Sequence, residues 1–239
     1  MGFLLVEVGV FFRDVSIFDF LTDTQWTPLF DDKHFGILPL LSGTFITSLV
    51  AIVLALPLGL SIAIFLNAYA HKNTRKIFKP LLELLAAVPT VIYGFFALVI
   101  VTPFLQSFIP GLAGFNSLSA GLVMGIMIIP FISSLSEDAL FAVPKNLREA
   151  SYAMGATRFQ TVFKVTIPAA SSGIIVSVIL AISRAIGETM IVAIAAGQQP
   201  RLTLNPLVPV ETISAYIVQV SLGDVPHNSL EYQTIFVAG

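Results

Sequence analysis

Two long stretches of the chain contain no charged side chain, and this feature constrains the fold more than any other. Residues 34–71 and 84–136 contain no Lys, Arg, Asp or Glu. Each stretch exceeds the roughly 20 residues that one helical membrane crossing requires. Hydrophobic residues make up 56% of the 239 residues, charged residues make up 11%, and the mean hydropathy is +0.92. This composition excludes a water-soluble domain and predicts an all-α, polytopic membrane helical bundle.

Proline, glycine and charge divide the apolar stretches into predicted membrane crossings. The longer stretch must cross twice, because Ile109-Pro110-Gly111 and Gly114 end helices without requiring charge. A later apolar run is longer than one bilayer crossing demands. The predicted crossings are residues 41–66, 81–108, 117–135 and 167–196.

The two ends of the chain resemble parts of further membrane helices. Residues 1–12 are apolar but too short to span a membrane, and they lack the basic start of a signal peptide. Residues 232–239 begin another apolar run. We therefore expect a single transmembrane domain over 1–239 that is truncated within its first and last membrane helices.

Basic residues predict the orientation, because short loops that carry Lys and Arg stay on the cytoplasmic side. The loop at 71–79 and the loop at 137–165 carry Lys72, Arg75, Lys76, Lys79, Lys145, Arg148, Arg158 and Lys164. Residues 13–40 and 197–230 carry few basic residues and many acids, including Asp14, Asp19, Asp23, Asp31 and Asp32. We expect the first two loops inside the cell and the last two segments outside it.

No residue pattern indicates catalysis, a metal site or a cofactor site. The chain has no Cys, and His34, His71 and His227 are widely separated. The phosphate-binding P-loop that ATP hydrolysis needs is absent. We expect no catalytic residue, no metal, no cofactor and no nucleic-acid partner, and energy supplied by another subunit.

The polar segment between Pro144 and Pro168 carries the most specific motif. Asn146 followed by Glu149 predicts a helix that starts with reciprocal capping, and Gly155 predicts its left-handed end. The segment also contains apolar side chains that a solvated loop has little use for, namely Leu147, Ala150, Tyr152, Ala153, Met154 and Phe159. We predict a docking helix, and the alternative is an amphipathic helix that lies on lipid headgroups.

This segment resembles the EAA loop of ABC importer permeases. It contains Glu149-Ala150-Ser151, three further residues, Gly155, nine further residues and then Val165-Thr166-Ile167-Pro168. The family pattern has Ala, Ile and Leu at 151, 165 and 167. The resemblance implies the type I ABC importer permease (MetI-like) architecture, in which the loop is a coupling helix held in a cleft of the ATP-hydrolysing subunit. We assign coupling to the motif residues Glu149, Ala150 and Gly155, and to Leu147, Tyr152 and Met154 as apolar side chains of the same segment.

A second motif, Ser183-Arg184-Ala185-Ile186-Gly187-Glu188-Thr189-Met190, places two charges inside the predicted crossing 167–196. An Arg at the centre of a membrane helix costs about 2.5–3.5 kcal/mol, whereas a helical ion pair returns about 0.2–0.5 kcal/mol. Pairing alone does not balance that cost. We predict that Arg184 and Glu188 line a transport path, and a structural interhelical salt bridge is the alternative.

This octapeptide resembles the permease subunits of the phosphate-specific ABC importer. Ala87–Gly94 resembles another of their segments, similarity extends from about Gly36 to the end, and the part after Met190 is more similar to the C-type than to the A-type subunit. The resemblance implies a multi-pass inner-membrane permease that translocates inorganic phosphate. It also implies an A-type permease partner, an ATP-binding subunit dimer and a periplasmic phosphate-binding protein. The alternatives are a permease for sulfate or molybdate, and a secondary transporter or channel.

Overall fold

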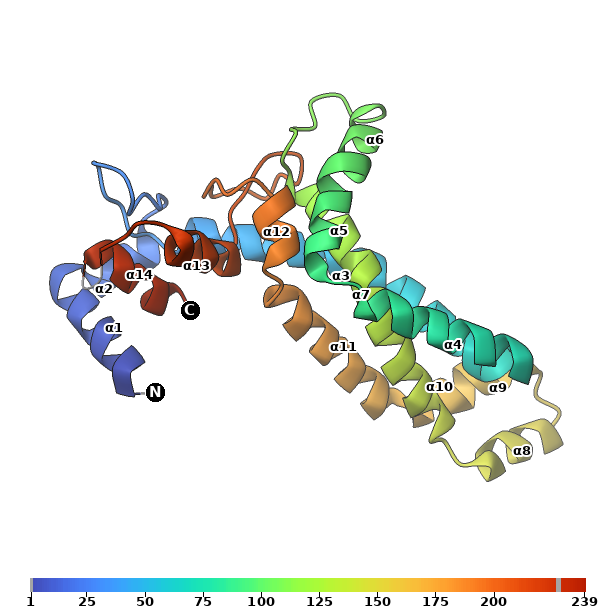
Figure 1. The fold of residues 1–239 in the computed structure, drawn as a ribbon. Coiled ribbons are helices and arrows are strands. Elements are labelled where there is room, and N and C mark those ends of the chain that lie inside the picture. The colour runs from blue at the N-terminus through green and yellow to red at the C-terminus, as the bar shows by residue number, and fades with distance from the viewer. Residues whose placement is uncertain (1, 227–228) are drawn as a thin grey trace. The chain divides into compact units, whose positions relative to one another are not determined.

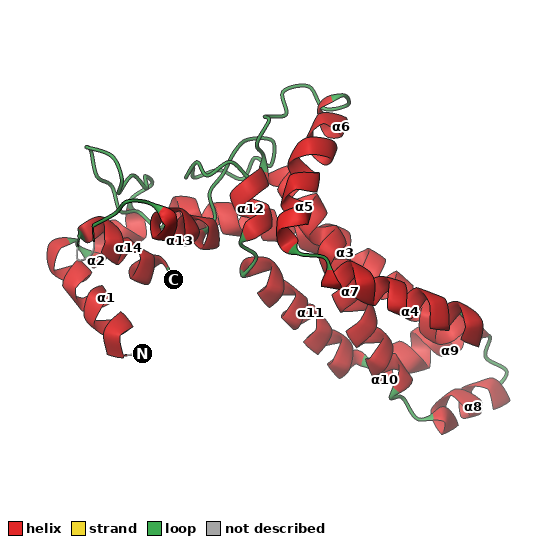
Figure 2. Ribbon diagram, viewed as in Figure 1, coloured by secondary structure: helices red, strands yellow, loops and turns green. Residues whose placement is uncertain are grey.

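The structure is a computed structural model that describes residues 2–226 and 229–239, so the predicted loop residue His227 lies outside the described residues. Helices joined by loops make up this part of the chain (Figure 2). The pairs Trp26–Phe35 and Gly197–Val210 form isolated bridges. The predicted all-α fold class is confirmed.

The chain divides into two compact units. The first contains Met1–Val50, Thr90–Val123 and Ile186–Gly239, and the second contains Ala51–Pro89 and Met124–Ala185. Figure 1 shows two long helices, α3 (Leu38–Ile64) and α7 (Ser117–Phe141). Each contributes residues to both units.

The first unit contains seven shorter α-helices among its described residues. They are α1 (Gly2–Asp14), α2 (Ile17–Thr22), α5 (Thr90–Phe96), α6 (Thr102–Gln106), α12 (Met190–Ala195), α13 (Ile213–Leu222) and α14 (Leu230–Ala238). A π-helical turn, Ala97–Val101, joins α5 to α6. Helix α1 packs against α14, and α5 packs against α12. The second contact is close at Gly94, because a Cβ atom there would lie only 2.9 Å from the side chain of Ile194.

The second unit contains α4 (Lys72–Ala87), α8 (Lys145–Ala153), α9 (Arg158–Thr161), α10 (Ile167–Ala169) and nearly all of α11 (Ser171–Ile186). π-Helical turns at Phe65–Tyr69 and Val162–Thr166 follow α3 and α9. The two long helices pack closely within this unit at Gly125, where a Cβ atom would lie 2.8 Å from the carbonyl oxygen of Ala51.

Two described helices are long and apolar enough to cross a membrane, Leu38–Tyr69 and Ser117–Phe141, and they contain the predicted crossings 41–66 and 117–135. The other two predicted crossings correspond to broken helix pairs that pass the same test only when each pair counts as one span.

The structure differs from the continuous runs that we predicted over 81–108 and 167–196. In the first run, Val88 is extended because it precedes Pro89, and this ends α4. In the second, the chain bends by 71° between residues 169 and 171, and a further break at 187–189 separates α11 from α12.

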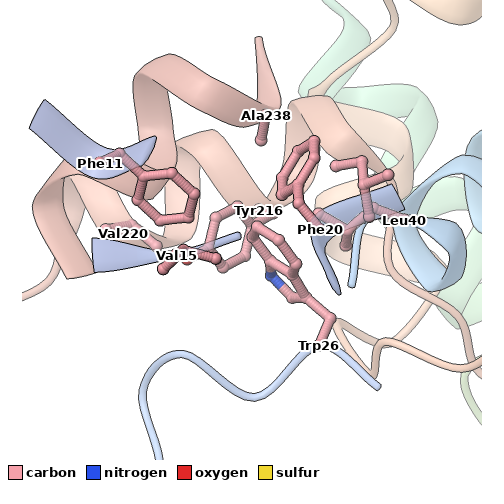
Figure 3. Close-up of a cluster of buried hydrophobic side chains, with 9 residues drawn as sticks. Phe11, Val15, Phe20, Trp26, Leu40, Tyr216, Val220 and Ala238 are labelled. Atoms are coloured by element: carbon pink, nitrogen blue, oxygen red, sulfur yellow. The ribbon is translucent and has the colours of Figure 1, made fainter. Parts of the chain in front are cut away.

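An aromatic core holds the first unit together. Phe11, Phe20, Trp26 and Tyr216 are buried with Val15, Ile37, Leu40, Val220 and Ala238 (Figure 3). The ring of Trp26 meets that of Tyr216 edge to face, with centroids 5.0 Å apart, and Phe11 meets Phe20 in the same way. Such pairs add to the free energy gained by burial alone. The core therefore fixes residues 11–40 against α13 and α14.

Candidate functional site

Helix α8 forms within the predicted docking segment, but it begins differently from the prediction. The predicted N-cap at Asn146 is wrong, because α8 starts at Lys145 and Pro144 occupies the N-cap position without a side-chain hydrogen bond. Proline suits this place because it fixes φ and leaves no amide hydrogen unpaired. The reciprocal capping arrangement occurs instead at the start of α9, between Thr157 and Gln160.

The predicted end of α8 at Gly155 is confirmed. Gly155 has a φ of +82°. Its amide donates to the carbonyl oxygen of Tyr152 at 2.9 Å, and the Ala156 amide donates to that of Ser151 at 3.2 Å. These two bonds are those of a Schellman motif, which favours glycine because a side chain is strained at this φ. A Cβ atom at Gly155 would meet nothing within 4 Å, so there is space for a side chain. Glycine is favoured here because of the positive φ angle and not because of crowding.

Helix α8 presents its apolar side chains at the surface. None of its residues is buried, and Met154, just after the helix, is 88% exposed. The exposed set contains every residue to which we assigned coupling, namely Leu147, Glu149, Ala150, Tyr152, Met154 and Gly155. Exposing this much apolar area to water on a short helix is unfavourable, so the exposed side chains indicate a surface that a partner covers.

Three interactions hold this segment in place. The hydroxyl oxygens of Ser151 and Thr161 lie 2.9 Å apart and join α8 to α9. The Arg148 guanidinium donates to the carbonyl oxygen of Leu140, and Arg158 lies over the ring of Tyr69 at 5.5 Å from its centroid. The polar groups thus anchor α8 and leave its apolar side chains free.

A buried carboxylate supports the same unit, and our sequence analysis did not single it out. Glu137 in α7 has a side chain that is 1% exposed, and it forms ion pairs with Arg75 and Lys79 of α4. Lys79 also pairs with Asp138 at 3.1 Å. The sequence shows basic residues in α4 and acidic residues near the end of α7, but it does not show that these two segments lie next to each other.

Arg184 lies in the last turn of α11, in the second unit. Its guanidinium contacts the Sδ atom of Met127 at 3.8 Å, which is a weak acceptor for a charged donor. The residue is exposed. Arg184 therefore keeps most of its hydrogen-bonding capacity for a ligand or a partner.

Glu188 lies beyond the end of α11, in the first unit. Its carboxylate accepts hydrogen bonds from the amides of Met190 at 3.2 Å and Ile191 at 3.4 Å, so this residue, just before the N-cap Thr189, satisfies the first amides of α12. Its own carbonyl oxygen accepts from the Ser214 hydroxyl at 2.7 Å. Because α11 ends at Ile186, Arg184 and Glu188 are not successive positions on one helix, and the i,i+4 pair that motivated the structural alternative does not form on α11.

The sequence profile described as the binding-protein-dependent transport system inner membrane component matches residues 55–222. This range contains α8, Gly155, Arg184 and Glu188.

Curated relatives match over most of the chain. The probable ABC transporter permease protein YqgH of Bacillus subtilis (strain 168) is 36% identical over 225 residues, which cover 94% of this chain and 72% of the relative. The phosphate transport system permease protein PstC of Mesorhizobium japonicum is 37% identical over 235 residues, with coverages of 89% and 71%. PstC of Xylella fastidiosa (strain Temecula1) is 36% identical over 217 residues, with coverages of 83% and 66%.

A solved structure shows the same fold. A chain of the MetNI methionine ABC transporter matches with a TM-score of 0.59 and 22% identity, over 84% of this chain and 85% of that chain. The MetI-like architecture that the resemblance implied is thereby confirmed.

Proposed function

This chain belongs to the family of binding-protein-dependent transport system inner membrane components, and we propose that it is the subunit through which an ABC importer moves inorganic phosphate across the cytoplasmic membrane. Phosphate is proposed as the substrate because two relatives named as phosphate transport permeases are 36–37% identical to this chain over more than four fifths of its length. The chain is a membrane permease component and not an enzyme.

In this proposal α8 is the coupling helix that an ATP-hydrolysing subunit grips. The exposed apolar side chains of Leu147, Tyr152 and Met154 support this role, because this chain leaves them uncovered and a partner can bury them. The Schellman end at Gly155 gives the helix a fixed length. Movement of the ATPase cleft would then shift α8 and α9 together through the Ser151–Thr161 hydrogen bond.

Arg184 and Glu188 take different parts in the proposed transport path. The Arg184 guanidinium offers a planar fork of donors that suits an oxyanion, and its contact with a thioether leaves those donors available. Glu188 is buried and satisfies the first amides of α12, so it supports the wall of the path by fixing the chain after α11. Residues 183–190 thus supply one cation for phosphate and one carboxylate for local structure.

The proposal requires an assembly. Its expected members are a homologous A-type permease that completes the pore, an ATP-binding subunit dimer and a periplasmic phosphate-binding protein, all in or at a bacterial-type inner membrane that this chain crosses several times. Two described helices long enough to span a bilayer support the membrane placement.

Uptake of radiolabelled phosphate by cells that depend on this subunit tests the proposal. We expect ATP-dependent uptake that excess unlabelled phosphate abolishes and excess sulfate or molybdate leaves intact. Competition by sulfate or molybdate would instead identify a permease for that oxyanion. Uptake that continues after the ATPase is inactivated would identify a secondary transporter or channel.

A further inference from the structure

A buried carboxyl group just before α13 lacks a hydrogen-bond partner. The Glu211 residue is 2% exposed, and its Oε1 atom makes no hydrogen bond with any described residue. Glu211 belongs to the segment 197–230, which we predict to lie outside the membrane and outside the cell. Burial raises the pKa of Glu211 to about 7. An acid this buried usually has a partner, so its environment requires an explanation.

The surrounding backbone fixes Glu211 in position. The Val210 amide donates to the carbonyl oxygen of Ala196 at 3.0 Å, and the Ile213 amide donates to the Thr44 hydroxyl at 3.1 Å. Helix α3 approaches so closely that a Cβ atom at Gly43 would lie 2.0 Å from the carbonyl oxygen of Glu211. The backbone that carries the carboxyl group is therefore held against α3 and against the end of α12.

Glu211 lines a cavity of about 300 Å³ within the first unit. Trp26, Phe30 and Tyr216 supply aromatic walls, and Gln219 adds a second buried oxygen, Oε1, that has no hydrogen-bond partner among the described residues. Figure 3 shows the indole of Trp26 beside Tyr216 at this place. No Lys, Arg or His is among the residues that the structure places on the wall.

These groups define the chemistry of an occupant. Two buried oxygens without a partner among the described residues, one of them on a carboxylate, outnumber the one buried donor without a partner, the neutral indole Nε1 of Trp26. With no positively charged side chain on the described wall, this balance favours a cation over an anion. One carboxylate is too few for a divalent ion, which prefers several oxygen ligands. Aromatic walls suit an alkyl chain and attract the cation at its end. We propose that this cavity binds an alkylammonium group, with its nitrogen at Glu211 and Gln219 and its carbon chain against Trp26 and Tyr216.

The occupant that we assign to the cavity is a lysine side chain of the extracytoplasmic binding protein, and this assignment rests on the proposed function. Charge complementarity supports it, because the same predicted outer segments expose Asp14, Asp19, Asp31 and Asp32. An acidic surface attracts a basic face on a soluble partner and speeds their encounter. The cavity would then receive one lysine from that face and fix its orientation.

The chain contains a natural probe for this site, because Trp26 is its single tryptophan. The first experiment titrates the purified full chain in phospholipid nanodiscs with n-butylammonium and follows Trp26 fluorescence. We expect a saturable change at pH 8 and none with n-butanol, which has the same carbon chain without the charge. At pH 6, binding should weaken about tenfold, since the carboxyl group is then mostly protonated. An equal response to butanol, or equal binding at both pH values, would overturn the proposal.

Variants separate binding from folding. Glu211→Gln keeps the shape of the side chain and should weaken butylammonium binding at least tenfold, whereas Asp224→Asn, which changes an exposed acid of the same predicted loop, should leave it unchanged. Gln219→Glu adds a second carboxyl group and should strengthen binding. If Glu211→Gln does not fold, the strengthened binding in Gln219→Glu still tests the site, and unchanged or weaker binding in that variant contradicts it.

A second experiment tests the lysine. In the assembled transporter, the affinity for the phosphate-binding protein should fall at least tenfold in Glu211→Gln, and butylammonium should compete with docking. Butylammonium that binds without displacing the protein would overturn the lysine as occupant. Failure of the proposed function would be distinct: the unmodified transporter would then take up no phosphate, while the fluorescence titration would still give its own answer.

Discussion

The aromatic core of the first unit and helix α8 of the second unit use apolar side chains in opposite ways. Phe11 is completely buried and meets neighbouring rings edge to face. Apolar side chains from residues 11–40, α13 and α14 therefore bury one another. Helix α8 has a comparable need to bury Leu147 and Tyr152 but buries neither. One apolar cluster therefore stabilises the chain, and the other is a surface that a partner completes.

The octapeptide at 183–190 shows the same contrast between two charges. Glu188 is buried and accepts two backbone amides, whereas Arg184 is exposed and contacts a thioether. A carboxylate that accepts backbone amides contributes to local structure, and a guanidinium whose donors contact only a thioether can bind a ligand.

The largest effect is expected at Arg184. Arg184→Gln should reduce phosphate uptake to background at nearly normal protein level, because the residue serves the anion path and not the fold. Uptake of radiolabelled phosphate at matched expression measures this. Arg201→Gln, at an exposed arginine of the predicted outer loop, is the matched control and should retain uptake.

Glu188→Gln and the double variant complete this test. A structural salt bridge would lower stability in each single variant and recover in the double one. We expect no recovery of uptake in the double variant, since Glu188 satisfies the first amides of α12 independently of Arg184. Near-normal transport in the double variant would contradict the assignment of Arg184 to the path.

A tenfold or larger loss of uptake is expected for Gly155→Leu. A residue other than glycine at this φ costs about 1–2 kcal/mol, which should loosen the end of α8 and uncouple the ATPase without affecting membrane insertion. Gly111→Leu provides a matched control, because Gly111 has a φ of +83° and an equally open Cβ position in a predicted outer turn. Equal uptake by both variants, with normal ATPase association, would contradict the assignment of Gly155 to coupling.

A pair of truncations compares the two apolar clusters directly. Phe11→Ala should destabilise the first unit by about 3–5 kcal/mol, because it leaves a cavity in the aromatic core. Tyr152→Ala should change the free energy of unfolding by less than about 0.5 kcal/mol but weaken ATPase association. Unfolding in detergent, followed by Trp26 fluorescence, measures the first effect, and copurification with the ATPase measures the second. The comparison fails if Tyr152→Ala destabilises the chain as much as Phe11→Ala.

Local sequence patterns predicted the parts of the molecule that local physics controls. Charge-free stretches indicated the two long helices, and Gly155 indicated the end of α8, because backbone conformation at φ above zero depends on the residue itself. The resemblance of residues 149–168 and 183–190 indicated the fold and family, which the comparisons confirm. The roles of the individual site residues stay predictions.

Features that depend on distant contacts did not follow from the sequence. Asn146 has the composition of an N-cap, but Pro144 sets the start of α8 two residues earlier. The spacing of Arg184 and Glu188 suggested one helix, yet a turn at Gly187 separates them. Glu211 lies next to no charged residue in sequence, and its burial follows only from the three-dimensional structure, where α3 approaches it at Gly43.

The smallest effect is expected at Ser151. Ser151→Ala installs the residue of the family pattern and removes the hydrogen bond between the hydroxyls of Ser151 and Thr161. One such bond contributes about 0.5–1.5 kcal/mol, and partial exposure places this bond at the lower end. Alanine also favours the helix more than serine, which offsets part of the loss. Phosphate uptake should stay within about twofold of the unmodified chain, with a slight decrease in the temperature of unfolding. A severe loss of uptake at preserved stability would mean that the Ser151 hydroxyl itself contacts the ATPase, and α8 would then dock through its polar side chains instead of its apolar ones.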